Sequence, residues 1–201
     1  MVRFLVLLLA MAATWWYFAR QRRERSRDAV ARARADFLAA AVPEPLDGRG
    51  MKEIAYRGGL VRLLIPETWS EEYEPDGGAT FGDPVSQGRA LRLHTITADK
   101  PGGAGREELA FLLGSLRPRD ECALTSLPDG QLLLKHVDAG REAGADVVLY
   151  TWQLARSVSP DRARIAVFTL AVAAEDAFSA LTNDDRRRVE RIVRAARIAD
   201  A

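Results

Sequence analysis

The sequence is poor in the residues that most often carry chemistry. Cys122 is the only cysteine, and His94 and His136 are the only histidines, in a chain of 201 residues. A lone cysteine excludes an intramolecular disulfide and a cysteine-rich zinc site, and Cys122 is interpreted as a small core residue. A metal site would need further ligands that the spacing does not reveal, such as Asp138, so both histidines are interpreted as solvent-facing strand residues. We therefore expect no metal site and no cofactor.

The motifs of common enzyme classes are absent as well. No serine stands in a G-x-S-x-G sequence, and Cys122 lacks the local signature of a cysteine protease. The glycine-rich loop at 102–105 has neither a G-x-G-x-x-G pattern nor the Lys-Ser/Thr ending of a phosphate loop, so it is interpreted as a connector. The sequence thus predicts no catalytic and no cofactor-binding residues, and a protein that is not an enzyme.

Charge is almost balanced over the chain but unevenly divided along it. Up to Val42 there are eight arginines against three acidic residues, a net charge of +5. The remainder has 21 basic against 25 acidic residues, a net charge of −4. The basic character therefore belongs to the N-terminal segment. A mildly acidic body argues against a nucleic acid as partner.

Phe4–Ala19 is a long apolar run without charge. As a helix it spans roughly 24 Å at 1.5 Å per residue, slightly less than the ~30 Å hydrocarbon core, and flanking arginines can reach the head groups. We therefore predict a transmembrane anchor over residues 1–19. Aromatic and basic residues follow where the membrane–water interface would lie, namely Trp15, Trp16, Tyr17, Arg20, Arg22 and Arg23.

Two alternatives bear on this anchor. The pattern Ala10-Met11-Ala12 is typical of a signal-peptide cleavage site, but cleavage there would leave a short apolar core and an aromatic new terminus. Five arginines between residues 20 and 27 favour a single-pass protein of an inner (plasma) membrane of bacterial type, with its domain in the cytoplasm. A periplasmic domain remains the alternative.

Residues 20–50 are expected to form a basic neck and linker. No proline or glycine occurs from Gln21 to Ala41, so the neck is predicted to be helical up to Pro43. Pro43, Pro45, Gly48 and Gly50 then favour a linker. One compact domain is expected to occupy residues 51–201.

The predicted elements of this domain are mostly short strands. Expected strands are Leu60–Ile65, Glu72–Glu74, Ala79–Phe81, Arg89–Thr97, Cys122–Leu127, Gln131–Asp138, Ala145–Ala155 and Arg164–Ala173. Helices are expected at Glu107–Leu116 and after Thr182, where Thr182-Asn-Asp-Asp185 resembles a capping box. The fold class is therefore α+β, with an antiparallel sheet of about six to seven strands packed by two helices and preceded by the transmembrane helix.

This element order, with a strand that ends in Ile65-Pro66-x-x-Trp69, resembles the PsbP-like fold over about Gly58 to Ile198. Photosystem II extrinsic proteins, a nuclear-transport Ran-binding factor and small bacterial envelope proteins of the DcrB type share that fold. The resemblance implies a binding or assembly role and no site residues, because members are mostly non-catalytic.

The sequence thus predicts a membrane-anchored, non-catalytic interaction or assembly module. Its expected partners are the membrane and a protein of unknown identity, and no nucleic acid. One alternative is a domain that binds lipid or a small ligand in an apolar pocket lined by Tyr150, Trp152 and Phe168. The other is a hydrolase with dispersed residues, which a cluster of either histidine with acidic groups would favour.

Overall fold

The computed structural model describes residues 28–84, 89–99, 105–115 and 121–199. The predicted anchor and all six interface residues, from Trp15 to Arg23, lie outside these ranges. Within the described ranges, none of the helices has the length and apolar character needed to cross a bilayer.

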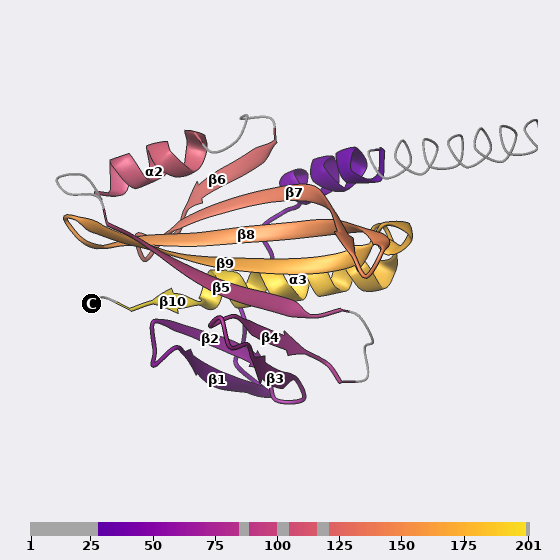
Figure 1. The fold of residues 1–201 in the computed structure, drawn as a ribbon, viewed down its shortest axis with the longest axis horizontal. Helices are drawn as coiled ribbons and strands as arrows, with labels where there is room; N and C mark the ends of the chain where they lie inside the picture. Colours follow the sequence, from indigo (N-terminus) through magenta and orange to yellow (C-terminus); the bar gives the residue numbers. More distant parts are fainter. Residues whose placement is uncertain (1–27, 85–88, 100–104, 116–120, 200–201) are drawn as a thin grey trace, which may run out of the picture.

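A seven-stranded antiparallel sheet forms the centre of the molecule (Figure 1). Its strands lie in the order β3, β4, β5, β9, β8, β7, β6, so that β3 and β6 are the edges. The four central strands are long and β-branched or apolar at alternating positions, as expected of a sheet with one face on the core and the other partly open to solvent. The bounds are β3 (Ser70–Tyr73), β4 (Ala79–Gly82), β5 (Leu91–Asp99), β6 (Cys122–Ser126), β7 (Leu132–Glu142), β8 (Ala145–Ser159) and β9 (Arg162–Ala173).

A second sheet of three strands was not predicted from the sequence. It joins β1 (Met51–Tyr56), β2 (Val61–Pro66) and β10 (Arg197–Ile198) in the order β1, β2, β10. Ile198 is the register partner of Val61, so the last described residues pair with a strand near the start of the domain. Figure 1 shows this small sheet beside the β3–β4 end of the large one.

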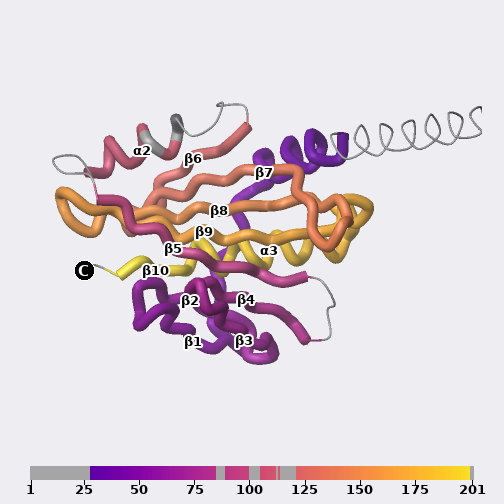
Figure 2. Tube along the Cα trace, viewed as in Figure 1, coloured from indigo at the N-terminus to yellow at the C-terminus, as the bar shows by residue number. Residues whose placement is uncertain are grey.

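Helices cover the two faces of the large sheet unequally. On one face lie the helix at residues 28–39 and α3 (Ala180–Ala195), while α2 (Arg106–Ser115) packs on the other face. Leu109 and Leu113 of α2 contact Leu132 and Leu134 of β7. The tube view follows the same arrangement along the chain (Figure 2). Beyond α2, the rest of this second face lacks a helix among the described residues.

The main core lies between the sheet and the two helices of the first face. Phe37 is fully buried, with its ring centroid 5.3 Å from that of Tyr150 and 5.0 Å from that of Trp152. Both contacts are edge-on, the favourable geometry for aromatic pairs. The helix at 28–39, which the sequence analysis assigns to a neck, thus contributes side chains to the core of the domain. The chain after it has no regular structure over residues 40–48.

The start of α3 differs from the prediction. The helix begins at Ala180, and Ser179 is its N-cap, with its Oγ accepting from the backbone N–H of Thr182 at 3.1 Å. Thr182 itself is buried, and its hydroxyl donates to the carbonyl of Asp176. The predicted capping box at Thr182 is therefore wrong, because Thr182 lies inside the first turn of α3 and its backbone N–H is the group that the N-cap Ser179 binds.

The α+β class and the large antiparallel sheet predicted from the sequence are confirmed. The structure adds the three-stranded sheet, and it shows that the helix at 28–39, predicted as part of the neck, packs on the core. A transmembrane helix before the domain lies outside the described residues and stays a prediction.

Candidate binding site

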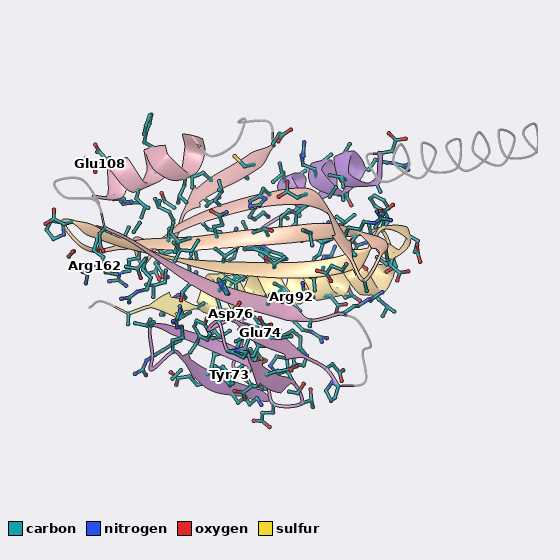
Figure 3. All side chains as sticks on the ribbon, in the orientation of Figure 1. Tyr73, Glu74, Asp76, Arg92, Glu108 and Arg162 are labelled. Carbon is teal, nitrogen blue, oxygen red and sulfur yellow. The ribbon has the colours of Figure 1, made fainter. Side chains whose placement is uncertain are left out.

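A cleft of about 250 Å³ opens on the second face of the large sheet, beyond the end that α2 covers. The turn between β3 and β4 forms one wall, β5 and β9 form the floor, and the end of the β7–β8 hairpin forms the other wall. The lining residues are Glu74, Gly78, Ala79, Arg92, Leu93, His94, Glu142, Leu149, Val167 and Thr169. Figure 3 shows Glu74, Asp76 and Arg92 grouped on this side of the molecule.

An ion pair closes the cleft on its hairpin side. Arg92 of β5 contacts Glu142 of β7 through both guanidinium Nη atoms, with Nη2 and Oε2 at 3.0 Å. The hydrogen bond to Glu142 raises the pKa of Arg92. Strands β9 and β8 separate the two strands in the sheet order, so the hairpin end must curl over the face to reach β5.

Gly140 makes this curl sterically possible. A Cβ at this position would lie 2.8 Å from Cδ1 of Leu149 and 3.0 Å from Cγ2 of Val147. Because glycine has no Cβ, both side chains of β8 can fold over β7 at this point.

The opposite wall brings polar groups together around Gly78. A Cβ there would lie 2.9 Å from Oε2 of Glu74, 3.2 Å from Nδ1 of His94 and 3.3 Å from Oδ1 of Asp76. Glu74 accepts a hydrogen bond from the hydroxyl of Thr80, and Asp76 accepts one from the backbone N–H of Gly78. Within the described residues, no group of three or more His, Cys, Asp or Glu side chains is arranged to hold a metal ion.

The wall belongs to a segment with charge of one sign only. Residues 66–88 contain no lysine and no arginine, but six acidic residues, which are Glu67, Glu71, Glu72, Glu74, Asp76 and Asp83. Lys52 of β1 neutralises one of them, with its Nζ 2.9 Å from Oε1 of Glu71. The hydrogen bond from Lys52 lowers the pKa of Glu71. The sequence analysis missed this acidic hairpin, although the charge pattern of residues 66–88 is visible in the sequence.

The two histidines lie on the same face of the sheet but in different surroundings. His94 is exposed on β5, as predicted, whereas His136 on β7 is only 4% exposed, so the prediction that it faces solvent is wrong. His136 Nδ1 lies 3.1 Å from Oδ2 of Asp138, and its Nε2 lies 3.2 Å from Nε2 of Gln153. Three strand spacings, roughly 14 Å, separate β5 from β7. The structure therefore does not bring the histidines into one cleft.

Cys122 is partly buried and packs against the small core under α2, in line with its interpretation as a core residue. It is the register partner of His136 across β6 and β7. However, His136 Nε2 faces Gln153 on β8, which lies on the opposite side of β7 from β6.

A buried ionic cluster occupies the other face of the sheet. Lys135 and Glu190 have side chains 6% and 5% exposed, with Nζ 3.0 Å from Oε2, and Arg194 lies 3.1 Å from Oε1. Desolvation by burial lowers the pKa of Lys135, against the attraction of Glu190. The pair Glu190–Arg194 follows from i, i+4 spacing, whereas Lys135 is 55 residues away in sequence and was not predicted.

The residues proposed to line a lipid pocket are buried by packing within the described part of the chain. Tyr150, Trp152 and Phe168 are each fully buried in the main core. Phe37 packs against the first two, and the Tyr150 hydroxyl donates to the carbonyl of Ala177 at 3.0 Å. These contacts describe a filled interface between sheet and helices.

Comparison with known proteins identifies a shared fold. No protein-family model matches the chain. A search of curated proteins finds no match either. A solved structure from Bacteroides thetaiotaomicron VPI-5482 is similar, with 13% identity and a TM-score of 0.52 over 75% of this chain. The chain covers 49% of that protein's length, about half of it.

Two further solved structures are similar to the chain over most of their length. The Ran-binding protein Mog1p of Saccharomyces cerevisiae has 13% identity and a TM-score of 0.42, over 75% of this chain and 96% of its own. LpqN of Mycobacterium tuberculosis, involved in cell envelope biogenesis, has 12% identity and a TM-score of 0.46, over 81% and 94%. At such identities the likeness concerns the fold alone.

Proposed function

We propose that the protein is a non-catalytic interaction or assembly module of PsbP-like type, held at a membrane by Phe4–Ala19. The observation that carries this proposal is the uncovered part of the second sheet face. There the acidic β3–β4 hairpin, His94 and the Arg92–Glu142 pair surround an open cleft. Exposed charged groups around a shallow cleft suit recognition of a protein surface, where charge complementarity supplies specificity.

The competing functions have less support from the same residues. A ligand site for an apolar molecule would need access to Tyr150, Trp152 or Phe168, all of which are fully buried. A hydrolase built on the histidines is favoured by their acidic neighbours, Asp138 beside His136 and Glu74 near His94, but the two histidines lie three strand spacings apart and do not share one cleft. The interaction module is therefore the function that the geometry supports best.

The interaction can be tested with the full chain in its own membrane. A photoreactive amino acid at position 94, in the cleft, is expected to cross-link to a reproducible protein partner. The same amino acid at the position of exposed Val42 serves as control. Recovery of lipid alone, or of the same proteins from both positions, would contradict the proposal.

Anchoring and orientation are proposed from the sequence, with the domain on the cytoplasmic side. Two reporters are fused after Ala201, one that is active only in the cytoplasm and one that is active only in the periplasm. We expect activity from the first reporter alone. Activity of a reporter that works only in the periplasm would reverse the orientation. Release of the chain from membranes by carbonate at high pH would contradict a transmembrane anchor.

A further inference from the structure

Strand β3 has a free edge in the part of the chain that the structure describes. It pairs with β4 on one side, and no strand flanks it on the other. All four of its residues are exposed. A backbone edge of this kind presents N–H and C=O groups that another strand can bond.

The hydrogen bonds of the hairpin show which backbone groups point outward. The N–H of Glu74 donates to the carbonyl of Gly78 at 2.9 Å, so this pair bonds inward. In an antiparallel ladder such pairs alternate, which makes Glu72 the next inward residue and leaves the N–H and C=O groups of Glu71 and Tyr73 directed outward. In agreement, the carbonyl of Trp69, two residues before Glu71, accepts a hydrogen bond at 2.8 Å from Lys52 outside the ladder.

The side chains around this edge determine what kind of strand could pair with β3. Tyr73 is 55% exposed, and its hydroxyl donates to Oε2 of Glu71 at 2.9 Å. Glu72 and Glu74 alternate with them and belong to the opposite face. Among the ion pairs of the described residues, Lys52 pairs with Glu71 and Arg92 with Glu142, and none joins a cation to Glu72 or Glu74, although Arg92 attracts Glu74 from the cleft side. A second copy of β3 would place carboxylates opposite carboxylates, which is unfavourable.

We propose that the β3 edge binds an extended, cationic segment of a protein partner, which adds a strand beside Glu71–Tyr73 and places basic side chains against Glu72 and Glu74. This inference rests on the proposed function, because it names the chemistry of the partner that the module takes. The added strand would bond the outward groups of Glu71 and Tyr73, and the apolar side chains that alternate with its basic ones would cover the Tyr73 ring.

Binding of labelled peptides to the full chain in detergent micelles tests the proposal, with fluorescence anisotropy as readout. The probe is an eight-residue peptide of alternating lysine and valine, and a peptide of alternating glutamate and valine is its control. A third peptide has the lysine–valine sequence with N-methyl groups on alternate amides, which removes strand-pairing donors and keeps the charge. We expect only the first peptide to bind, with affinity that falls as salt rises. Equal binding of the N-methylated peptide, or binding of none, would overturn the proposal.

Variants of the chain separate the backbone from the side chains. Tyr73→Pro removes an outward N–H at an edge position that tolerates proline, whereas Tyr73→Ala keeps that N–H. We expect roughly tenfold weaker binding for Tyr73→Pro and a smaller loss for Tyr73→Ala, since each lost hydrogen bond is modest. Glu72→Gln is expected to flatten the salt dependence, and Glu108→Gln, an exposed carboxylate on α2, is the matched control. Figure 3 shows Glu108 above the large sheet and Tyr73 below it in this view. Circular dichroism confirms that each variant is folded.

A cross-linking comparison distinguishes this inference from the proposed function. Photoreactive amino acids are placed at Tyr73 and at Phe111, which is 74% exposed on α2. A protein partner that cross-links from Tyr73 and not from Phe111 supports the edge. A partner that cross-links from position 94 or Phe111, but not from Tyr73, leaves the interaction module standing and overturns the edge as its site.

Discussion

Arg92 and Glu142 form a two-point ion pair although strands β9 and β8 lie between β5 and β7 in the sheet. The contact exists because the β7–β8 hairpin curls over the sheet face at Gly140. It fixes the position of one wall of the cleft, whereas the opposite wall is held by the short β3–β4 turn. The shape of the cleft therefore depends on a surface interaction.

Removal of this ion pair should loosen the hairpin without unfolding the domain. The Arg92 and Glu142 side chains are 50% and 34% exposed, so the pair stabilises the fold by at most about 1 kcal/mol. In Glu142→Gln we expect faster amide hydrogen exchange in residues 140–147 and an almost unchanged melting temperature. Glu53→Gln, which removes the exposed pair with Arg62, is the control. Unchanged exchange in the hairpin would show that the curl does not need the pair.

Gly140→Ala should destabilise the fold through the same hairpin. The new Cβ would overlap Leu149 and Val147 and force them from their positions, at a cost of about 1–3 kcal/mol. Gly130→Ala would not serve as a control, because the positive φ of Gly130, +85°, would itself be strained in alanine. Ala139→Gly, at the exposed neighbouring position, is better suited. Urea unfolding of the full chain in micelles measures the difference, and an unchanged midpoint would contradict the steric argument.

The buried pair Lys135–Glu190 should show strong coupling in a double-mutant cycle. Lys135→Met alone leaves a buried carboxylate with Arg194 as its remaining partner, and Glu190→Leu alone leaves a buried ammonium group. Each single change is expected to cost about 3–5 kcal/mol, and the double change much less than their sum. Chemical denaturation of the four proteins measures the coupling. Additive losses would contradict it.

The lowered pKa of Lys135 should also make the stability of the protein depend on pH. Burial lowers the pKa of Lys135 below the ordinary lysine value of 10.5, so between the folded and the unfolded pKa the unfolded chain binds a proton that the folded chain does not. Stability therefore rises with pH across that window as the desolvation penalty is relieved. The unfolding free energy of the wild type should therefore rise relative to that of Lys135→Met as the pH approaches 10.5. A flat difference would contradict the direction.

Phe37→Ala tests whether the helix at 28–39 belongs to the folded domain. Phe37 is 1% exposed and fills the space beside Tyr150 and Trp152, so truncation should cost about 3–5 kcal/mol. Leu38→Ala, on a half-buried neighbour, should cost less. Near-ultraviolet circular dichroism is expected to report altered packing around the tryptophan. A loss no larger than that of Leu38→Ala would place the helix outside the cooperative unit.

Most strands of the large sheet could be predicted because their apolar residues alternate. Leu91 and Leu93 are buried and Arg92 and His94 are exposed, as the alternation in β5 predicts. Strand β1 was missed because its sequence MKEIAY has a weak alternation, with only two buried positions. Strand β10 has two residues and is held by pairing with β2, a contact that no local pattern contains.

The candidate site could be predicted only in part, because it depends on the order and register of the strands and on the curling of the β7–β8 hairpin over the sheet. Local charge shows that the β3–β4 hairpin is acidic, but not that β3 is an edge. The Arg92–Glu142 contact joins residues 50 positions apart and needs the bend at Gly140. His136 lies on an alternating strand as predicted, yet it is buried, since alternation identifies a face and not what covers that face.

The pairing of β10 with β2 has a consequence for the synthesis of the protein. Gln131 accepts from the backbone N–H of Ile198 and donates to the carbonyl of Ala196, so the end of the chain is clamped to the middle as well as to β2. The three-stranded sheet cannot be completed until residues 197–198 have been synthesised, whereas all seven strands of the large sheet end by Ala173. During synthesis, strand β2 therefore lacks one of its partners for as long as it takes to make about 130 further residues, and incomplete sheets of this kind are prone to aggregate.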